Sequence, residues 1–183
     1  MQAAALFAAL AALGVAVREG RLELVDHFAF RHLQPLRKGD WSLLTTPAGP
    51  VAASLLVLAG AARIRRGRGI RAAWILAYAA GIAIEVAGKR LVERAGVDAD
   101  RLPWLAHDGF PSGHTLRGVL VAGVLASAWP RARRPLVAWA VANAVLVETT
   151  GMHPLSEVVG GLVAGMALIA CVRAARRADC QGL

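Results

Sequence analysis

The chain has 183 residues, a formal net charge of +9 and a composition that is 57% hydrophobic but only 5% aromatic. This length suits one domain, and the number of long uncharged runs argues against a water-soluble one. The basic residues stand in short blocks between the apolar runs, which is typical of membrane proteins that contact anionic lipid. We therefore expect the positive charge to serve a membrane rather than nucleic acid.

Six apolar runs follow one another along the chain and predict six transmembrane helices. They cover residues 2–17, 41–62, 72–88, 114–129, 135–150 and 154–172. No basic stretch precedes the first run, so we favour a retained span over a cleaved signal peptide. The sequence thus predicts an all-α polytopic membrane protein, with residues 1–183 forming a single six-span domain.

The linkers between these runs differ in charge and predict the orientation. Residues 63–71, 131–134 and 173–177 are rich in arginine and contain no acid, whereas residues 18–40 and 89–113 mix bases with acids. The positive-inside rule then places both termini and the arginine-rich linkers in the cytoplasm. The short chain and its arginine- and alanine-rich composition favour a plasma (inner) membrane. Apolar residues recur among charges between residues 22 and 33, which predicts a short interfacial helix in the first outer linker.

Two features offer little for metal or redox chemistry. Cys171 and Cys180 have no metal-ligand spacing and are interpreted as unpaired thiols. Asp98, Asp100 and Asp108 have the oxygen ligands that a cation prefers, but we favour solvated side chains. We expect no metal and no cofactor.

A first candidate site precedes the fourth run. Ser112 and Gly113 stand before an apolar helix, whose free N–H groups favour an anion. Ser112 adds a hydroxyl and Gly113 permits close approach of the backbone. The alternative is a plain helix N-cap.

A second candidate lies at the start of the sixth run. His153 precedes Pro154, and Glu157 follows His153 by four residues, so both side chains share one helix face. A carboxylate that holds one imidazole nitrogen leaves the other available as a base or nucleophile. The alternative is that Glu157 only complements the helix dipole.

A third candidate ends the third run. Lys89 follows Glu85 by four residues inside an apolar stretch, where ionisable groups are usually paired or functional. Lys89 then faces a phosphate with Glu85 as its support, or the two form a simple pair that eases insertion. Arg94 and Arg101 follow in the same linker as further phosphate donors, with a solvated surface role as the alternative.

Together these pieces resemble the type 2 phosphatidic acid phosphatase family of membrane phosphatases. Its Pro-Ser-Gly-His motif is intact at residues 111–114, its first motif keeps Lys89 with Arg94 inside the gap, and its third motif keeps His153. Glu157 stands where that family has aspartate. With the motif order and the six-span layout, the resemblance covers nearly the whole chain.

The chain departs from the family where two arginines are expected. The first motif's Arg-Pro falls on Gly96-Val97, and the third motif's Ser-Arg falls on Leu146-Val147. Each lost charge-assisted donor costs about 1.5–3 kcal/mol of binding. A working site therefore needs replacements.

Three arginines are candidates for this replacement. They are Arg94, Arg101 and Arg117. Arg117 follows His114 by three residues, so the two lie on neighbouring positions of one helix face.

The resemblance implies a mechanism without a metal. His153 attacks phosphorus to form a phosphohistidine, Glu157 orients it, and His114 protonates the leaving alkoxide and then activates water. The phosphate oxygens are held by Lys89, Ser112 and the Gly113 N–H. Such chemistry relies on positioning and charge stabilisation.

The implied substrate is a lipid phosphate at the outer face. Phosphatidate-type lipids, phosphatidylglycerol phosphate, polyprenyl phosphates or diphosphates and lipid A phosphates all fit. Two alternatives stay open: a weakly active or inactive family member that binds phospholipid head groups, favoured by the missing arginines, and a small transporter, favoured by Glu85 and Glu148 within apolar runs.

Overall fold

The computed structural model describes residues 1–34, 36, 42–65, 67–92 and 109–181, and every regular element in those ranges is helical. The all-α prediction is confirmed. In chain order the elements are α1 (Gln2–Arg18), α2 (Glu23–His32), α3 (Ser42–Thr45), η1 (Thr46–Ala48), α4 (Pro50–Arg63), α5 (Arg68–Leu91), α6 (Gly113–Ala128), η2 (Pro130–Ala132), α7 (Arg133–Thr149) and α8 (Leu155–Gln181).

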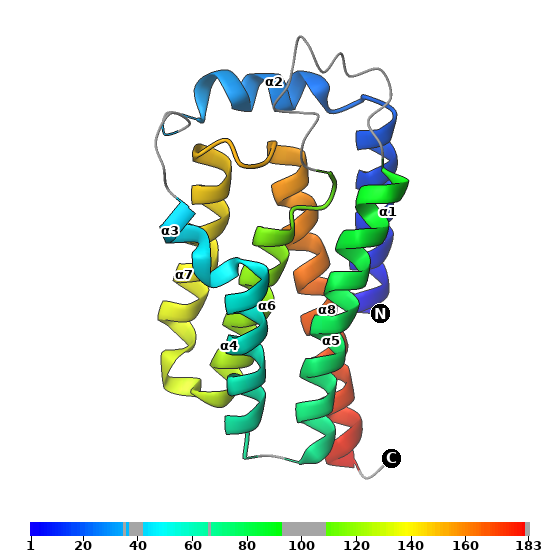
Figure 1. Ribbon diagram of the computed structural model, residues 1–183. Coiled ribbons are helices and arrows are strands. Elements are labelled where there is room, and N and C mark those ends of the chain that lie inside the picture. Colours follow the sequence, from blue (N-terminus) through cyan, green and yellow to red (C-terminus); the bar gives the residue numbers. More distant parts are fainter. Residues whose placement is uncertain (35, 37–41, 66, 93–108, 182–183) are drawn as a thin grey trace.

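The helices form a bundle around α6 and α8. α8 packs against α1, α5 and α6, and α6 also packs against α4 and α7. Leu116, Leu120 and Val124 of α6 and Leu168 of α8 lie in one buried apolar core. The starts of α6 and α8 therefore lie side by side at one end of the bundle (Figure 1).

Glycines allow α8 to approach α6 closely. A Cβ atom on Gly161 would lie 2.6 Å from the carbonyl oxygen of Ser112, and one on Gly165 would lie 2.7 Å from the Val119 side chain. Small residues at helix contacts are typical of membrane bundles, where close backbone approach replaces hydrophobic driving force. This contact sets the spacing between the two motif-bearing helix starts.

Apolar side chains cover much of the outer surface. Val137, Val141 and Val145 recur every four residues along α7, and each is more than half exposed, at 52–56%. Leu55 and Leu58 of α4 are similarly exposed, at 63% and 54%. Exposed apolar stripes of this kind mark a surface that contacts lipid, so the helices are those of a membrane protein.

The prediction of six spans is supported only in part. α5, with 24 residues, and α8, over the 25 residues Leu155–Asp179, are long and apolar enough to cross a membrane. α1 and α2 pass only as a pair, bent by 85°, which gives at most three candidate spans among the described residues. At a rise of about 1.5 Å per residue, helices of 14–17 residues such as α4, α6 and α7 fall short of a hydrocarbon core about 30 Å thick.

The second apolar run, residues 41–62, was predicted as one span but is broken. α3 and η1 precede α4, which begins at Pro50, with Pro47 inside η1. Proline lacks an N–H and suits the first turn of a helix rather than its interior. The run therefore divides at these two prolines.

The two ends of the bundle differ in what they carry. The links from α4 to α5 and from α6 to α7 lie at the same end as the C-terminus, whereas α2 lies across the opposite end (Figure 1). The helix predicted within residues 22–33 is thus present as α2, and it covers the end at which α6 and α8 begin.

Candidate functional site

Ser112 begins α6 as its N-cap. Its Oγ accepts hydrogen bonds from the amide of Thr115 at 3.4 Å and from the Thr115 hydroxyl at 3.2 Å. The Ser112 amide donates to the carbonyl oxygen of Glu157 at 2.9 Å, which joins the starts of α6 and α8. The structure thus shows the capping role, and contact of Ser112 with a phosphate is a proposal.

His153 and Glu157 form a buried pair at the start of α8. The His153 Nδ1 lies 2.8 Å from Oε2 of Glu157, and the two residues are 4% and 0% exposed. An ionised carboxylate only accepts, so a proton on Nδ1 completes this hydrogen bond, and the neutral ring then has its lone pair on Nε2. The spacing of four residues therefore places the side chains as a base or nucleophile requires.

The two histidines of the motifs lie close together although they come from different helices. The ring centroids of His114 and His153 are 6.2 Å apart, and the rings are tilted by 53°. Asn143 of α7 donates to the carbonyl oxygen of His114 at 3.3 Å, which holds this part of α6 in place. The structure thus brings together the two imidazoles that the sequence motifs singled out.

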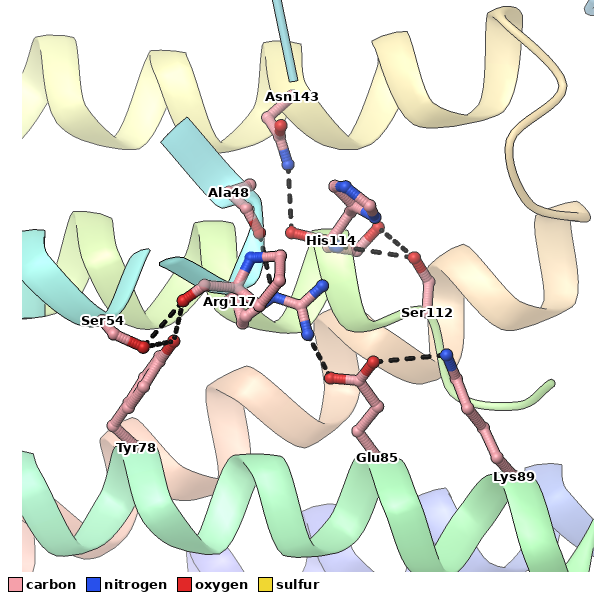
Figure 2. A network of polar contacts seen from close by, with 11 residues as sticks. Ala48, Ser54, Tyr78, Glu85, Lys89, Ser112, His114, Arg117 and Asn143 are labelled. Atoms are coloured by element: carbon pink, nitrogen blue, oxygen red, sulfur yellow. Dashed lines mark hydrogen bonds and ion pairs between the residues drawn. The ribbon is translucent and has the colours of Figure 1, made fainter. Parts of the chain in front are cut away.

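Three charged side chains meet one another near the start of α6 (Figure 2). Lys89 Nζ lies 3.3 Å from Oε1 of Glu85, and Arg117 Nη1 donates to Oε2 of the same carboxylate. The Arg117 Nε also donates to the carbonyl oxygen of Ala48 at 2.9 Å. Arg117 is only 6% exposed, so this arginine is buried and held at two points.

The charged group adjoins the start of α6. A Cβ atom on Gly113 would run into the Glu85 carboxylate, and one on Gly109 would lie 3.1 Å from the Cα of Lys89. A Cβ atom on Gly88 would lie 2.6 Å from the carbonyl oxygen of Phe110. The last turns of α5 therefore lie directly against the segment that carries the Pro-Ser-Gly-His motif.

The described residues do not include every site residue that the sequence predicts. Arg94 and Arg101 lie outside the described residues. Of the positions where the third motif's Ser-Arg falls, Val147 is fully buried and packs with Val158 in a small apolar cluster. Where the third motif has its arginine, α7 therefore contributes an apolar side chain that packs in the core.

Asp26 is a buried polar residue that the sequence analysis missed. It lies on α2, is 1% exposed, and accepts from the amide of Ser156 at 2.9 Å and from its hydroxyl at 2.7 Å. Ser156 lies in the first turn of α8, so Asp26 caps that helix from a distance in sequence. The available signal was an acid three residues before Ala29, among the apolar residues of α2.

Glu148, near the end of α7, is a second buried acid. It is 6% exposed and its Oε1 accepts from Gln34 Nε2 at 3.4 Å. In the part of the chain that the structure describes, Oε2 has no hydrogen-bond partner. Those residues also contain no group of three or more histidine, cysteine or acidic side chains arranged for a metal.

Comparison with known proteins supports the family resemblance of the sequence motifs. A model of the PAP2 superfamily matches residues 92–179, a stretch that includes residues 111–114, His153 and Glu157. Neither a search of curated proteins nor a search of solved structures found a match. The family model and the sequence motifs agree: residues 92–179 of the chain match the PAP2 superfamily, the family that the motifs indicated.

Proposed function

We propose that this protein is a membrane phosphatase that hydrolyses a phosphomonoester or diphosphate of a lipid through a phosphohistidine. The match to the PAP2 superfamily supports phosphatase chemistry. The observation that carries the proposal is the His153–Glu157 pair at 2.8 Å, with the His114 ring 6.2 Å from the His153 ring.

In the first step Nε2 of His153 attacks phosphorus. A P–N bond forms, the bond between phosphorus and the lipid oxygen breaks, and His114 donates a proton to the departing alkoxide. Glu157 stabilises the positive charge that develops on the His153 ring, because its carboxylate already holds Nδ1.

In the second step water attacks the phosphohistidine. His114, now neutral, accepts a proton from the water as the new P–O bond forms. The P–N bond breaks, inorganic phosphate leaves, and both histidines return to their starting states. One residue thus serves as acid and then as base, as proton balance requires.

The phosphate oxygens need cationic, hydroxyl and N–H donors. The proposed groups are Lys89, Arg117, the Ser112 hydroxyl and the Gly113 amide. Arg117 takes the place of the arginines that the motifs lack, with Arg94 and Arg101 as further candidates. Its buried position beside the start of α6 supports this assignment, because a charge-assisted hydrogen bond is stronger where water is excluded.

The substrate is an amphiphile, and the orientation follows from charge. A site at the end of the bundle meets lipid head groups that are already concentrated at the membrane interface. The arginine-rich links lie at the other end, which supports a cytoplasmic position for them and an extracytoplasmic one for the site (Figure 1). Phosphatidate-type, phosphatidylglycerol, polyprenyl and lipid A phosphates remain the candidate classes.

A second function is favoured by one observation, the apolar and glycine residues at the two motif arginine positions. A member with weakened phosphate contacts binds phospholipid head groups without efficient turnover. This second reading predicts binding of lipid phosphates with little phosphate release.

The deciding experiment measures release of inorganic phosphate in detergent from short-chain phosphatidate, polyprenyl diphosphate and phosphatidylglycerol phosphate. Wild type is compared with His153→Ala and with His32→Ala, in which an exposed histidine of α2 is removed from the same end of the bundle. We expect the first substitution to abolish turnover and the second to preserve it. Equal rates for wild type and His153→Ala would exclude the phosphohistidine mechanism.

A further inference from the structure

The Glu85 carboxylate lies where an anion would be expected. Its two oxygens are divided between two cations, Oε1 toward Lys89 of the same helix and Oε2 toward Arg117 of α6. Figure 2 shows both cationic side chains pointing toward the carboxylate from different directions.

The same carboxylate also lies against the N-terminus of α6. Gly113 is the first residue of that helix, and a Cβ there would run into the carboxylate. A helix N-terminus carries partial positive charge and attracts anions. One acid thus contacts the three positive features that the proposed function assigns to a phosphoryl group: Lys89, Arg117 and the start of α6.

We infer that Glu85 is an internal competitor, whose carboxylate occupies the phosphoryl position of the ligand-free site and is displaced when an anion binds. The inference rests on the proposed function for the identity of that anion. It concerns the affinity of the site for phosphate, which is measurable without turnover.

Glu85 has an alternative role as a support that holds the two cations in place. The contacts of Arg117 argue against it, because its Nε is fixed separately by the Ala48 carbonyl oxygen at 2.9 Å and the residue is 6% exposed. Lys89 is on the same helix as Glu85, and its side chain is 38% exposed, so it has room to turn toward a ligand. Arg117 therefore has one anchor that does not depend on Glu85.

The two roles predict opposite changes in anion affinity when the Glu85 carboxylate is removed. A support that is removed weakens anion binding, whereas a competitor that is removed strengthens it, because one negative charge no longer neutralises two cations and no longer fills the space before Gly113. A competing carboxylate also favours departure of inorganic phosphate at the end of each turnover, because it returns to the two cations as the product leaves.

The experiment compares Glu85→Gln and Glu85→Asp with wild type, using orthophosphate and orthovanadate as probes. Direct binding to the detergent-solubilised full chain is measured by calorimetry, and inhibition of phosphate release is measured in parallel. We expect Glu85→Gln to bind orthophosphate about tenfold more tightly. Glu85→Asp, which keeps the charge but withdraws the carboxylate by one methylene from Gly113, should fall between Glu85→Gln and wild type.

Asp179→Asn is the control for net charge, since it removes one negative charge from an exposed acid of α8 that lies beside Gly67 and Gly69 at the start of α5, far along that helix from Glu85 and Lys89. We expect its affinity for orthophosphate to stay within twofold of wild type. If the control gained as much affinity as Glu85→Gln, the gain would come from the change in net charge and the inference would be wrong. Unchanged or weaker binding in both Glu85 variants would overturn the inference. If Glu85→Gln binds orthophosphate more tightly but wild type hydrolyses no lipid phosphate, the role of Glu85 as a competitor is supported and the proposed phosphatase function is wrong.

Discussion

Asp26 of α2 accepts two hydrogen bonds from Ser156 of α8, one from the amide at 2.9 Å and one from the hydroxyl at 2.7 Å. The helix that lies across one end of the bundle is thereby tied to the first turn of the helix that carries Glu157 (Figure 1). A carboxylate that caps a helix from another element fixes where that helix begins.

Replacing Asp26 by alanine should therefore lower both stability and activity. Loss of a buried, charged cap costs about 2 kcal/mol, which corresponds to about 4–8 °C in the melting temperature of a chain of this size. Thermal unfolding in detergent measures the first effect. Asp26→Asn keeps one acceptor oxygen, so its loss of stability should be about half that of Asp26→Ala. Unchanged melting temperatures in both variants would contradict the capping role.

Glu157→Gln should reduce the turnover number by about 100-fold or more. The amide still fits the space beside His153, but it carries no charge to stabilise the imidazolium and does not enforce the Nδ1–H tautomer. Steady-state kinetics on a lipid phosphate measure kcat and KM separately, and the loss should appear in kcat. Glu157→Asp restores the residue type of the family motif and should retain far more activity, whereas equal losses in the two variants would indicate a purely structural role.

Arg117→Ala should weaken substrate binding. Removing one charge-assisted donor costs about 1.5–3 kcal/mol, or roughly 10- to 150-fold in affinity. Arg133→Ala is the control, because Arg133 is the first residue of α7 and lies at the other end of the bundle from the site. We expect this variant to leave the KM unchanged. If Arg117→Ala has an unaltered KM, Arg117 does not replace the missing motif arginine, and Arg94 or Arg101 would be the remaining candidates.

Gly161→Ala should disturb the approach of α8 to α6. The added Cβ would lie 2.6 Å from the Ser112 carbonyl oxygen, so the helices must separate and the His114–His153 spacing of 6.2 Å must change. Overpacking of this kind costs about 1–3 kcal/mol. Gly69→Ala is the control, because its Cβ would meet Asp179 at an ordinary 3.6 Å. Full activity in Gly161→Ala would show that the spacing tolerates movement.

The orientation is tested by labelling introduced cysteines with a membrane-impermeant maleimide. In a chain in which Cys171 and Cys180 are serine, a cysteine at His32 should react from outside intact cells, whereas one at Ser127 should react only after permeabilisation. These positions lie at opposite ends of the bundle, His32 ending α2 and Ser127 near the end of α6. The reverse pattern would place the site in the cytoplasm.

The sequence by itself determined the features that depend on neighbours along the chain. Apolar runs between arginine blocks located α1 and α5–α8, and helical periodicity put His153 beside Glu157 and Glu85 beside Lys89, because side chains four residues apart share a face. The prolines that break the second run were also visible, although their effect on residues 41–62 was not predicted.

Only the tertiary structure decided which helix faces meet. The Asp26–Ser156 and Arg117–Glu85 contacts join residues 130 and 32 positions apart, and no spacing along the chain predicts them. They depend on the rotation of each helix about its axis and on how closely glycines let the backbones approach. Those quantities are set by packing over the whole bundle.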